Sequence, residues 1–313
     1  MRIMFHPLLG LLTLFLLFNT ACASNRTMEP SGSDSGGYEY SAILAATEFI
    51  VGENRFPFAL ITVDGEELME PSVKVKFFSL NQEEPKFKGE HQANWQETVG
   101  TTPHVHDDGH VHLHINSRGV FVIDSVAFDE PGYWGTSFTI GNGESDQGEI
   151  QGMAFEVLRD SLTPKIGEKV PSINNLTIKD VNDFSDISSR VMEDDMHRYS
   201  VAQALDLGKP FVVLFSTPMF CISRMCGPIT DVAAGLHAKY GEQVPFIHIE
   251  PYDLKIAREE GRLVTVDAMH AWNLVSEPWL FVIDEDGRVS QRFEGLVSAG
   301  ELELALTEVL KNT

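Results

Sequence analysis

Basic residues are scarce in this chain. Its 313 residues include 23 lysines and arginines against 46 aspartates and glutamates, which gives a formal net charge of −23. An acidic surface repels phosphate groups, so the composition argues against nucleic acid or an anionic membrane surface as a partner. The apolar content of 43% and the charged content of 22% are typical of a soluble globular protein.

Long apolar runs are also scarce. The stretch from Leu8 to Phe18 follows the positive charge of Arg2, and its 11 residues are too few to span a bilayer. A positive charge, a short apolar segment and then small residues are typical of a secretory signal, which we assign to residues 1–23. No later segment is long and apolar enough to cross a membrane. We therefore expect an exported protein.

Two cleavage sites are compatible with this signal. The run Ala21-Cys22-Ala23 fits an ordinary site of small residues, whereas Asn19 to Cys22 is similar to a bacterial lipoprotein box. In that box Asn19 replaces the usual aliphatic residue, and cleavage there would leave Cys22 lipidated at the new N-terminus. Residues 24–40 contain many Ser and Gly residues and suit a flexible linker. We favour a lipoprotein anchored to the cell membrane outside the cytoplasm; a secreted protein is the alternative.

Cysteine is the third scarce feature, with three in the whole chain. If Cys22 is lipidated or removed, Cys221 and Cys226 have only each other as partners, and an exported protein meets an oxidising compartment. Both follow the apolar run Phe211 to Phe215, where a strand is expected to give way to a helix. Unpaired N–H groups and the positive end of the helix dipole stabilise a thiolate at such a junction. We predict a redox-active pair; a small structural disulfide or two inert thiols are the alternatives.

The rest of the chain has two regions with different patterns of apolar residues. Within residues 41–160, Val73, Val75 and Phe77 alternate with lysines, and turn signals separate short apolar runs. This period of two predicts an all-β sandwich of immunoglobulin-like type. Within residues 161–313, strands and helices alternate, which predicts an α/β domain whose sheet is covered by helices. We expect one helix after Ser200, one after the cysteines, a helical stretch from Leu254 to Leu274 and a last helix capped by Ser298.

The second domain resembles the thioredoxin-like superfamily in several short motifs. Gly208-Lys-Pro210 is similar to the approach to the central strand, and Pro228 stands where the redox helix carries a kink proline. Glu277-Pro278 is similar to the cis-proline that opens the next strand beside the redox centre, and Ile166 to Pro171 resembles the start of exported members. The resemblance implies a thioredoxin-like fold across this half, with Pro278 shaping the substrate-facing backbone.

The spacing of the cysteines departs from thioredoxin, because four residues separate them instead of two. The wider spacing is similar to that of atypical peroxiredoxins. Five helical steps rise about 7.5 Å, and disulfides need Cα atoms within about 7 Å. On a regular helix the first turn must therefore unwind for the pair to oxidise, whereas in a loop the two can pair directly.

The positions of the residues suggest their roles. Cys221 lies nearer the sheet edge and would be the nucleophile, and Cys226 would resolve the mixed disulfide. Arg224 is a nearby cation that would lower the pKa of Cys221; a solvated surface arginine is the alternative. We expect thiol–disulfide exchange with protein thiols or disulfides outside the cytoplasm, with no required cofactor. A thiol peroxidase is one alternative, and a non-enzymatic metal-binding protein with a structural disulfide is another. A copper chaperone of this fold matches less well, because Ser276-Glu277 occupies the position of its histidine.

A histidine cluster is the remaining feature. Five of the 11 histidines lie within 11 residues and alternate with apolar residues: His104, His106, His110, His112 and His114. A three-residue loop closed by Gly109 would set His104 opposite His112 on one face of a hairpin, whereas a two-residue loop would scatter the histidines. In the first register the cluster is a candidate Zn²⁺ or Cu²⁺ site. A wet strand face or a pH sensor is the alternative.

Overall fold

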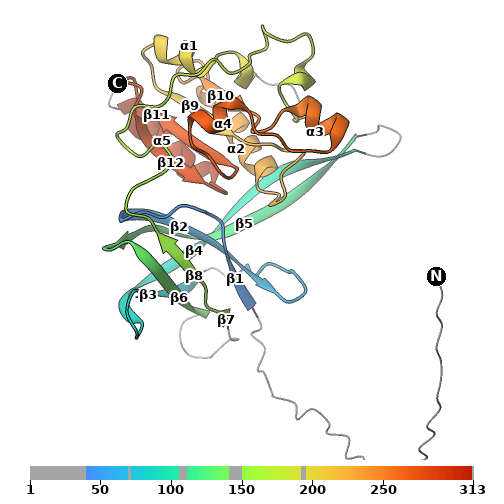
Figure 1. Ribbon diagram of the computed structural model, residues 1–313. Helices are drawn as coiled ribbons and strands as arrows, with labels where there is room; N and C mark the ends of the chain where they lie inside the picture. Colours follow the sequence, from blue (N-terminus) through green and yellow to red (C-terminus); the bar gives the residue numbers. More distant parts are fainter. Residues whose placement is uncertain (1–39, 70–71, 106–110, 141–149, 192–194, 312–313) are drawn as a thin grey trace, which may run out of the picture. The chain divides into compact units, whose positions relative to one another are not determined.

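Two separate β-sheets organise this protein in the computed structural model (Figure 1). The structure describes residues 40–69, 72–105, 111–140, 150–191 and 195–311. The expected signal, Cys22 and all but the last residue of the expected linker lie outside the described residues. Within them, no helix has the length and apolar character needed to cross a membrane.

The first sheet has eight strands in the order β7-β1-β2-β5-β4-β3-β6-β8. Its members are β1 (Tyr40–Leu44), β2 (Gly52–Thr62), β3 (Ser72–Ser79), β4 (Lys86–Val105), β5 (Val111–Phe128), β6 (Gly132–Ile140), β7 (Ile150–Gln151) and β8 (Ala154–Val157). Apart from the parallel contact of β1 with β7, neighbouring strands are antiparallel. The all-β character of this half is confirmed.

The expected immunoglobulin-like sandwich is not what the structure has, because these strands form one curled sheet and not two facing sheets. Leu158, just after β8, exchanges backbone hydrogen bonds with Phe49 and Val51, just before β2. The sheet thus folds over a core rich in phenylalanine, in which Phe56, Phe58 and Phe121 are fully buried. Alternation along a strand shows that one face is buried; it does not show whether the covering layer belongs to the same sheet.

The second sheet has four strands in the order β10-β9-β11-β12. They are β9 (Phe211–Phe215), β10 (Phe246–Ile249), β11 (Trp279–Ile283) and β12 (Val289–Glu294). β9 and β10 are parallel, whereas β11 is antiparallel to both β9 and β12. A βαβ unit followed by a β-hairpin and a final helix agrees with the alternation of strands and helices expected for residues 161–313.

Helices cover both faces of this sheet. They are α1 (Val201–Asp206), α2 (Cys226–Tyr240), α3 (Leu254–Glu260), α4 (Asp267–Ala271) and α5 (Ala299–Lys311), with short 3-10 helices η1 (Phe184–Asp186) and η2 (Asp195–His197) before α1. Every residue of β9 is buried, since alternate side chains enter two different hydrophobic clusters. The expected helix after Ser200 is present as α1, and Ser200 and Gln203 form a capping box at its start. The expected helical stretch 254–274 is instead two helices, because Gly261 takes a left-handed conformation and ends α3.

The long hairpin of the first sheet packs on the helix that carries Cys226. A Cβ placed on Gly100 of β4 would lie 2.3 Å from the Cα of Pro228, so the two backbones meet with no room for a side chain. Val120 and Val122 of β5 pack in one cluster with Leu296 and against Met225, the residue before α2. The first sheet therefore supports the start of α2.

Candidate functional site

A loop between β9 and α2 carries Cys221, the first of the two cysteines predicted to form a redox pair. β9 ends at Phe215, α2 begins at Cys226, and Cys221 lies in the irregular segment between them. Arg224 has a φ of 60°, which lets the loop turn back toward the helix start. Because Cys221 is not on regular helix, the two Sγ atoms can come together to form a disulfide without unwinding α2. The helix begins two residues before Pro228.

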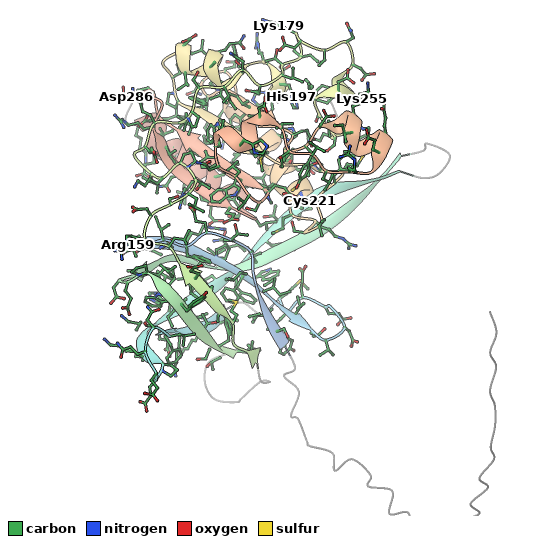
Figure 2. The ribbon with its side chains drawn as sticks, viewed as in Figure 1. Arg159, Lys179, His197, Cys221, Lys255 and Asp286 are labelled. Atoms are coloured by element: carbon green, nitrogen blue, oxygen red, sulfur yellow. The ribbon has the colours of Figure 1, made fainter. Side chains whose placement is uncertain are left out.

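The two cysteines are reduced and lie close together. Cys221, labelled in Figure 2, is partly exposed, whereas Cys226 is fully buried. Their Sγ atoms and a carboxylate oxygen of Glu277 all lie within 4.8 Å of one another. The backbone N–H of Cys226 donates to the Sγ of Cys221 at 3.4 Å, so the first amide of the helix points at this sulfur, as expected.

Their surroundings shift the pKa values of the two thiols in opposite directions. A hydrogen bond from the Cys226 thiol lowers the pKa of Cys221 to about 6, against the opposing effect of burial, and Ser223 and the Cys226 N–H help. Burial raises the pKa of Cys226 well above its usual value, and its hydrogen bond to Cys221 adds to the rise. Cys221 therefore has the properties of an attacking thiolate, and Cys226 those of a thiol held in reserve.

Two residues near the sulfurs, Glu277 and Tyr252, were not predicted from the sequence as site residues. Glu277 precedes Pro278, and the peptide bond between them is cis, as the resemblance implied. Burial raises the pKa of Glu277, and the Tyr252 hydroxyl donates to its carboxylate at 2.8 Å. The position of Glu277 beside a proline expected at the redox centre was the signal that could have found it.

A buried polar chain lies beneath the helix start. The hydroxyl of Thr230 donates to the carbonyl of Cys226 at 2.6 Å and contacts the Ser216 hydroxyl at 2.6 Å. His248 reaches Ser216 through Nε2 at 3.0 Å and His197 through Nδ1 at 3.2 Å. His248 is a core residue, and these hydrogen bonds fix the end of β9 against α2.

The remaining residues predicted from the sequence are Arg224 and the histidine cluster. Arg224 is not among the main causes of the lowered pKa of Cys221, and its role stays a prediction. His106 and His110 lie outside the described residues. The backbone register sets His104 opposite His112 and Thr102 opposite His114, which is the register of the three-residue loop. Metal binding by the cluster stays a prediction.

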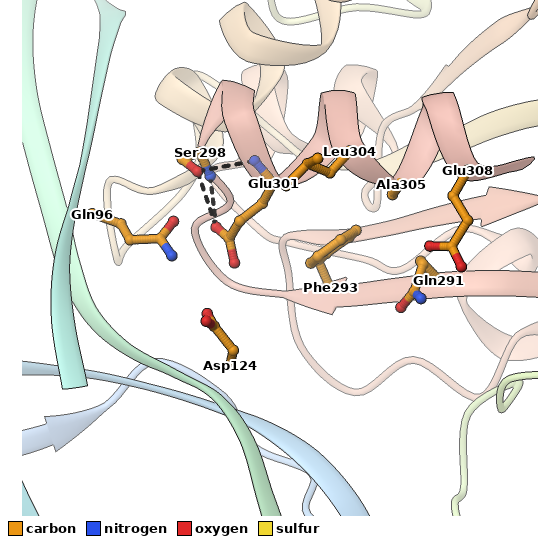
Figure 3. Close-up of a pocket in the computed structure, with 9 residues that line it drawn as sticks. All are labelled: Gln96, Asp124, Gln291, Phe293, Ser298, Glu301, Leu304, Ala305 and Glu308. Carbon is orange, nitrogen blue, oxygen red and sulfur yellow. Dashed lines mark hydrogen bonds between the residues drawn. The ribbon is translucent and has the colours of Figure 1, made fainter. Parts of the chain in front are cut away.

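A pocket elsewhere does not involve the sulfurs. It encloses about 540 Å³ between the first sheet and the start of α5, where Ser298 and Glu301 cap the helix (Figure 3). Its lining includes Asp124, Glu301 and Glu308 and no residue of the cysteine loop or α2. We assign it no part in the chemistry.

Comparison with known proteins finds a structural likeness at low sequence identity. One solved structure similar to this chain is a thiol:disulfide interchange protein of the thioredoxin family from Chlorobium tepidum TLS. The identity is 18%, the TM-score is 0.32, and the match covers 48% of this chain and 99% of that one. No family model and no curated protein matches the chain. The interpretation of the site therefore rests on the sheet topology and the sulfur pair.

Proposed function

We propose that this protein is a thiol–disulfide oxidoreductase that acts on protein thiols or disulfides outside the cytoplasm. The observation that carries the proposal is the asymmetric pair: a partly exposed Cys221 of lowered pKa beside a fully buried Cys226 of raised pKa. Export and membrane anchoring are part of the proposal and are supported by the signal and by Cys22 in the sequence alone.

The exchange proceeds in two steps. The Cys221 thiolate attacks one sulfur of a substrate disulfide, forms a mixed disulfide and releases the other substrate sulfur as a thiolate, which takes a proton from water. Cys226 then loses its proton and attacks the Sγ of Cys221, which releases the second substrate thiolate and leaves the Cys221–Cys226 disulfide. Two electrons pass from the pair to the substrate. The same steps in reverse oxidise a substrate dithiol.

Insulin reduction with dithiothreitol as the electron donor tests the proposal. Cys221→Ser is expected to abolish turnover, since no second thiolate is poised at this site. Cys226→Ser is expected to accumulate a mixed disulfide with the substrate, visible by mass spectrometry. Cys22→Ser is the matched control and should retain full activity. A wild-type chain without insulin reduction, or a Cys221→Ser variant that keeps it, would overturn the proposal.

Peroxide reduction is the alternative use of the same pair. In that reaction Cys221 is oxidised to a sulfenic acid, and Cys226 attacks it with release of water. Hydrogen peroxide consumption, measured with the same three variants, separates the two activities. Peroxide turnover without insulin reduction would favour the peroxidase.

The histidine cluster is a second and independent proposal, a Zn²⁺ or Cu²⁺ site in the β4–β5 hairpin. Its support is the backbone register of His104 with His112. Titration of the chain with each metal, against a variant with alanine at His110 and His112, tests it.

A further inference from the structure

Three potential metal ligands meet beside the cis-proline. Among the described residues, Cys221, Cys226 and Glu277 each bring one ligand atom into a group in which all atoms lie within 4.8 Å of one another. They come from three different places, the β9–α2 loop, the first residue of α2 and the residue before Pro278. Zn–S and Zn–O bonds of about 2.0–2.3 Å place tetrahedral ligand atoms slightly under 4 Å apart, so small side-chain movements suffice.

The three ligand atoms favour Zn²⁺ over Cu⁺. Two thiolates and one carboxylate suit Zn²⁺, which accepts both sulfur and oxygen ligands, better than Cu⁺, which prefers sulfur alone. Three ligands leave a fourth tetrahedral position, and the partial exposure of Cys221 gives water access to it. Three negative ligands bind one divalent cation with little residual charge.

A further residue orients the carboxylate. The Tyr252 hydroxyl donates to Oε2 of Glu277 at 2.8 Å, which fixes the carboxylate and leaves Oε1 without that bond. Cys221 is oriented in the same way by the Cys226 N–H and by Ser223, whose hydroxyl lies 3.2 Å from its Sγ. Such supporting hydrogen bonds are typical of metal sites, where they hold the ligands in position before the metal arrives.

We propose that the reduced protein binds one Zn²⁺ ion through Cys221, Cys226 and Glu277, and that oxidation of the cysteine pair releases it. On binding, each thiol that is still protonated gives its proton to solvent. On release, the two cysteine thiolates give two electrons to a protein disulfide and form their own disulfide. The substrate disulfide takes two protons from solvent and becomes two thiols, and Zn²⁺ leaves with its charge unchanged. Binding goes beyond the proposed exchange activity; only the release step rests on it.

The experiment titrates Zn²⁺ into the reduced full chain without oxygen, by calorimetry and by competition with a chromogenic chelator. Co²⁺ is used as a second probe, because thiolate ligation gives a near-ultraviolet charge-transfer band that histidine ligation does not. We expect one thiolate-ligated ion in the reduced chain and none in the disulfide form. Cys221→Ser, at a partly exposed position, should abolish the band.

Two variants test the other parts of the site. Glu277→Gln should weaken Zn²⁺ binding at least about 10-fold, and Tyr252→Phe about 10-fold, as for other supporting residues. The variant with alanine at His110 and His112 should keep the charge-transfer band unchanged. Circular dichroism checks that each variant is folded.

The outcomes are separable from those of the exchange activity. A reduced, folded chain without a Co²⁺–thiolate band, or an equal band in the disulfide form, overturns the metal site whatever the insulin assay shows. Unchanged affinity in Glu277→Gln overturns the three-ligand site. Conversely, Zn²⁺ binding in a chain without insulin reduction would keep the metal site and remove the exchange.

Discussion

The two sheets differ in where their buried polar side chains gather. The curled sheet encloses packed aromatic rings, with Phe56 centred 5.0 Å from Phe49 and 5.0 Å from Phe77. The four-stranded sheet also has apolar clusters, but Ser216, His248 and Glu250 are buried near the carboxyl ends of β9 and β10, where the cysteine loop begins. Buried polar groups cost stability unless they are hydrogen-bonded, and Ser216 contacts both His248 and Thr230, whose hydroxyl donates to the carbonyl of the first residue of α2. We infer that the second sheet positions the sulfurs, whereas the first is a scaffold.

The largest expected effect is on that scaffold. Phe56→Ala removes a fully buried ring and should lower the free energy of unfolding by about 3–5 kcal/mol. Urea unfolding followed by circular dichroism measures it. Phe87→Ala, at a position that is 56% exposed, is the matched control and should cost below about 1.5 kcal/mol. If the first sheet is only a scaffold, Cys221 in the folded Phe56→Ala variant should be alkylated at the wild-type rate. A changed rate would show that the first sheet also affects the sulfurs.

The next effect contrasts the two sulfurs within the second region. A pKa of about 6 keeps Cys221 mostly as thiolate at pH 7, whereas burial raises the pKa of Cys226 well above its usual value and keeps that thiol protonated. Iodoacetamide should therefore modify Cys221 at least about 10-fold faster than Cys226 in the reduced, metal-free chain.

The sign of the pH dependence follows from the lowered pKa. The alkylation rate of Cys221 should stay near its maximum above pH 7 and fall as the pH drops through about 6. Peptide mass spectrometry resolves the two sites across this range. Equal rates, or a midpoint near that of an ordinary thiol, would remove the chemical asymmetry on which the exchange depends.

The sequence predicted the second region better than the first. The boundaries of β9, the start of α2 near the cysteines and Glu277-Pro278 were predictable, because apolar runs, caps and prolines are local signals. The single curled sheet was not, since the pairing of Leu158, just after β8, with residues before β2 is non-local. Glu277 and Tyr252 lie 25 residues apart in the chain, and only the fold brings the phenol onto the carboxylate.

A smaller effect is expected at a buried ion pair that links the regions. Glu48 binds Arg292 of β12 at 2.9 Å, and their side chains are 6% and 13% exposed. Burial opposes ionisation, but hydrogen bonds from Ser161, Leu162 and Thr163 and the Arg292 charge hold the pKa of Glu48 below its usual value. Glu48→Gln should therefore cost about 1–3 kcal/mol at pH 7.

Because the pKa of Glu48 is lower in the folded chain than in the unfolded one, its contribution is complete above about pH 4.3 and is lost as the pH falls through the folded value. The difference in unfolding free energy between wild type and Glu48→Gln should shrink over that range. Glu156→Gln, on the exposed side of β8, is the control and should stay within about 0.5 kcal/mol at every pH. A pH-independent difference would show that the ionised form of Glu48 is not what links the regions.

The last comparison tests a place where the first sheet meets α2, between Gly100 of β4 and Pro228. At Gly100 an added Cβ meets the backbone of Pro228, which cannot move without α2, so Gly100→Ala should cost about 1–3 kcal/mol. Because Pro228 lies two residues after Cys226, the same change should alter the alkylation rate of Cys221. Gly235→Ala, on the same helix with open space around it, should instead stabilise the protein by about 0.5–1 kcal/mol and leave the rate unchanged. If Gly100→Ala changes stability but not reactivity, the first sheet supports the helix without setting the chemistry at its start.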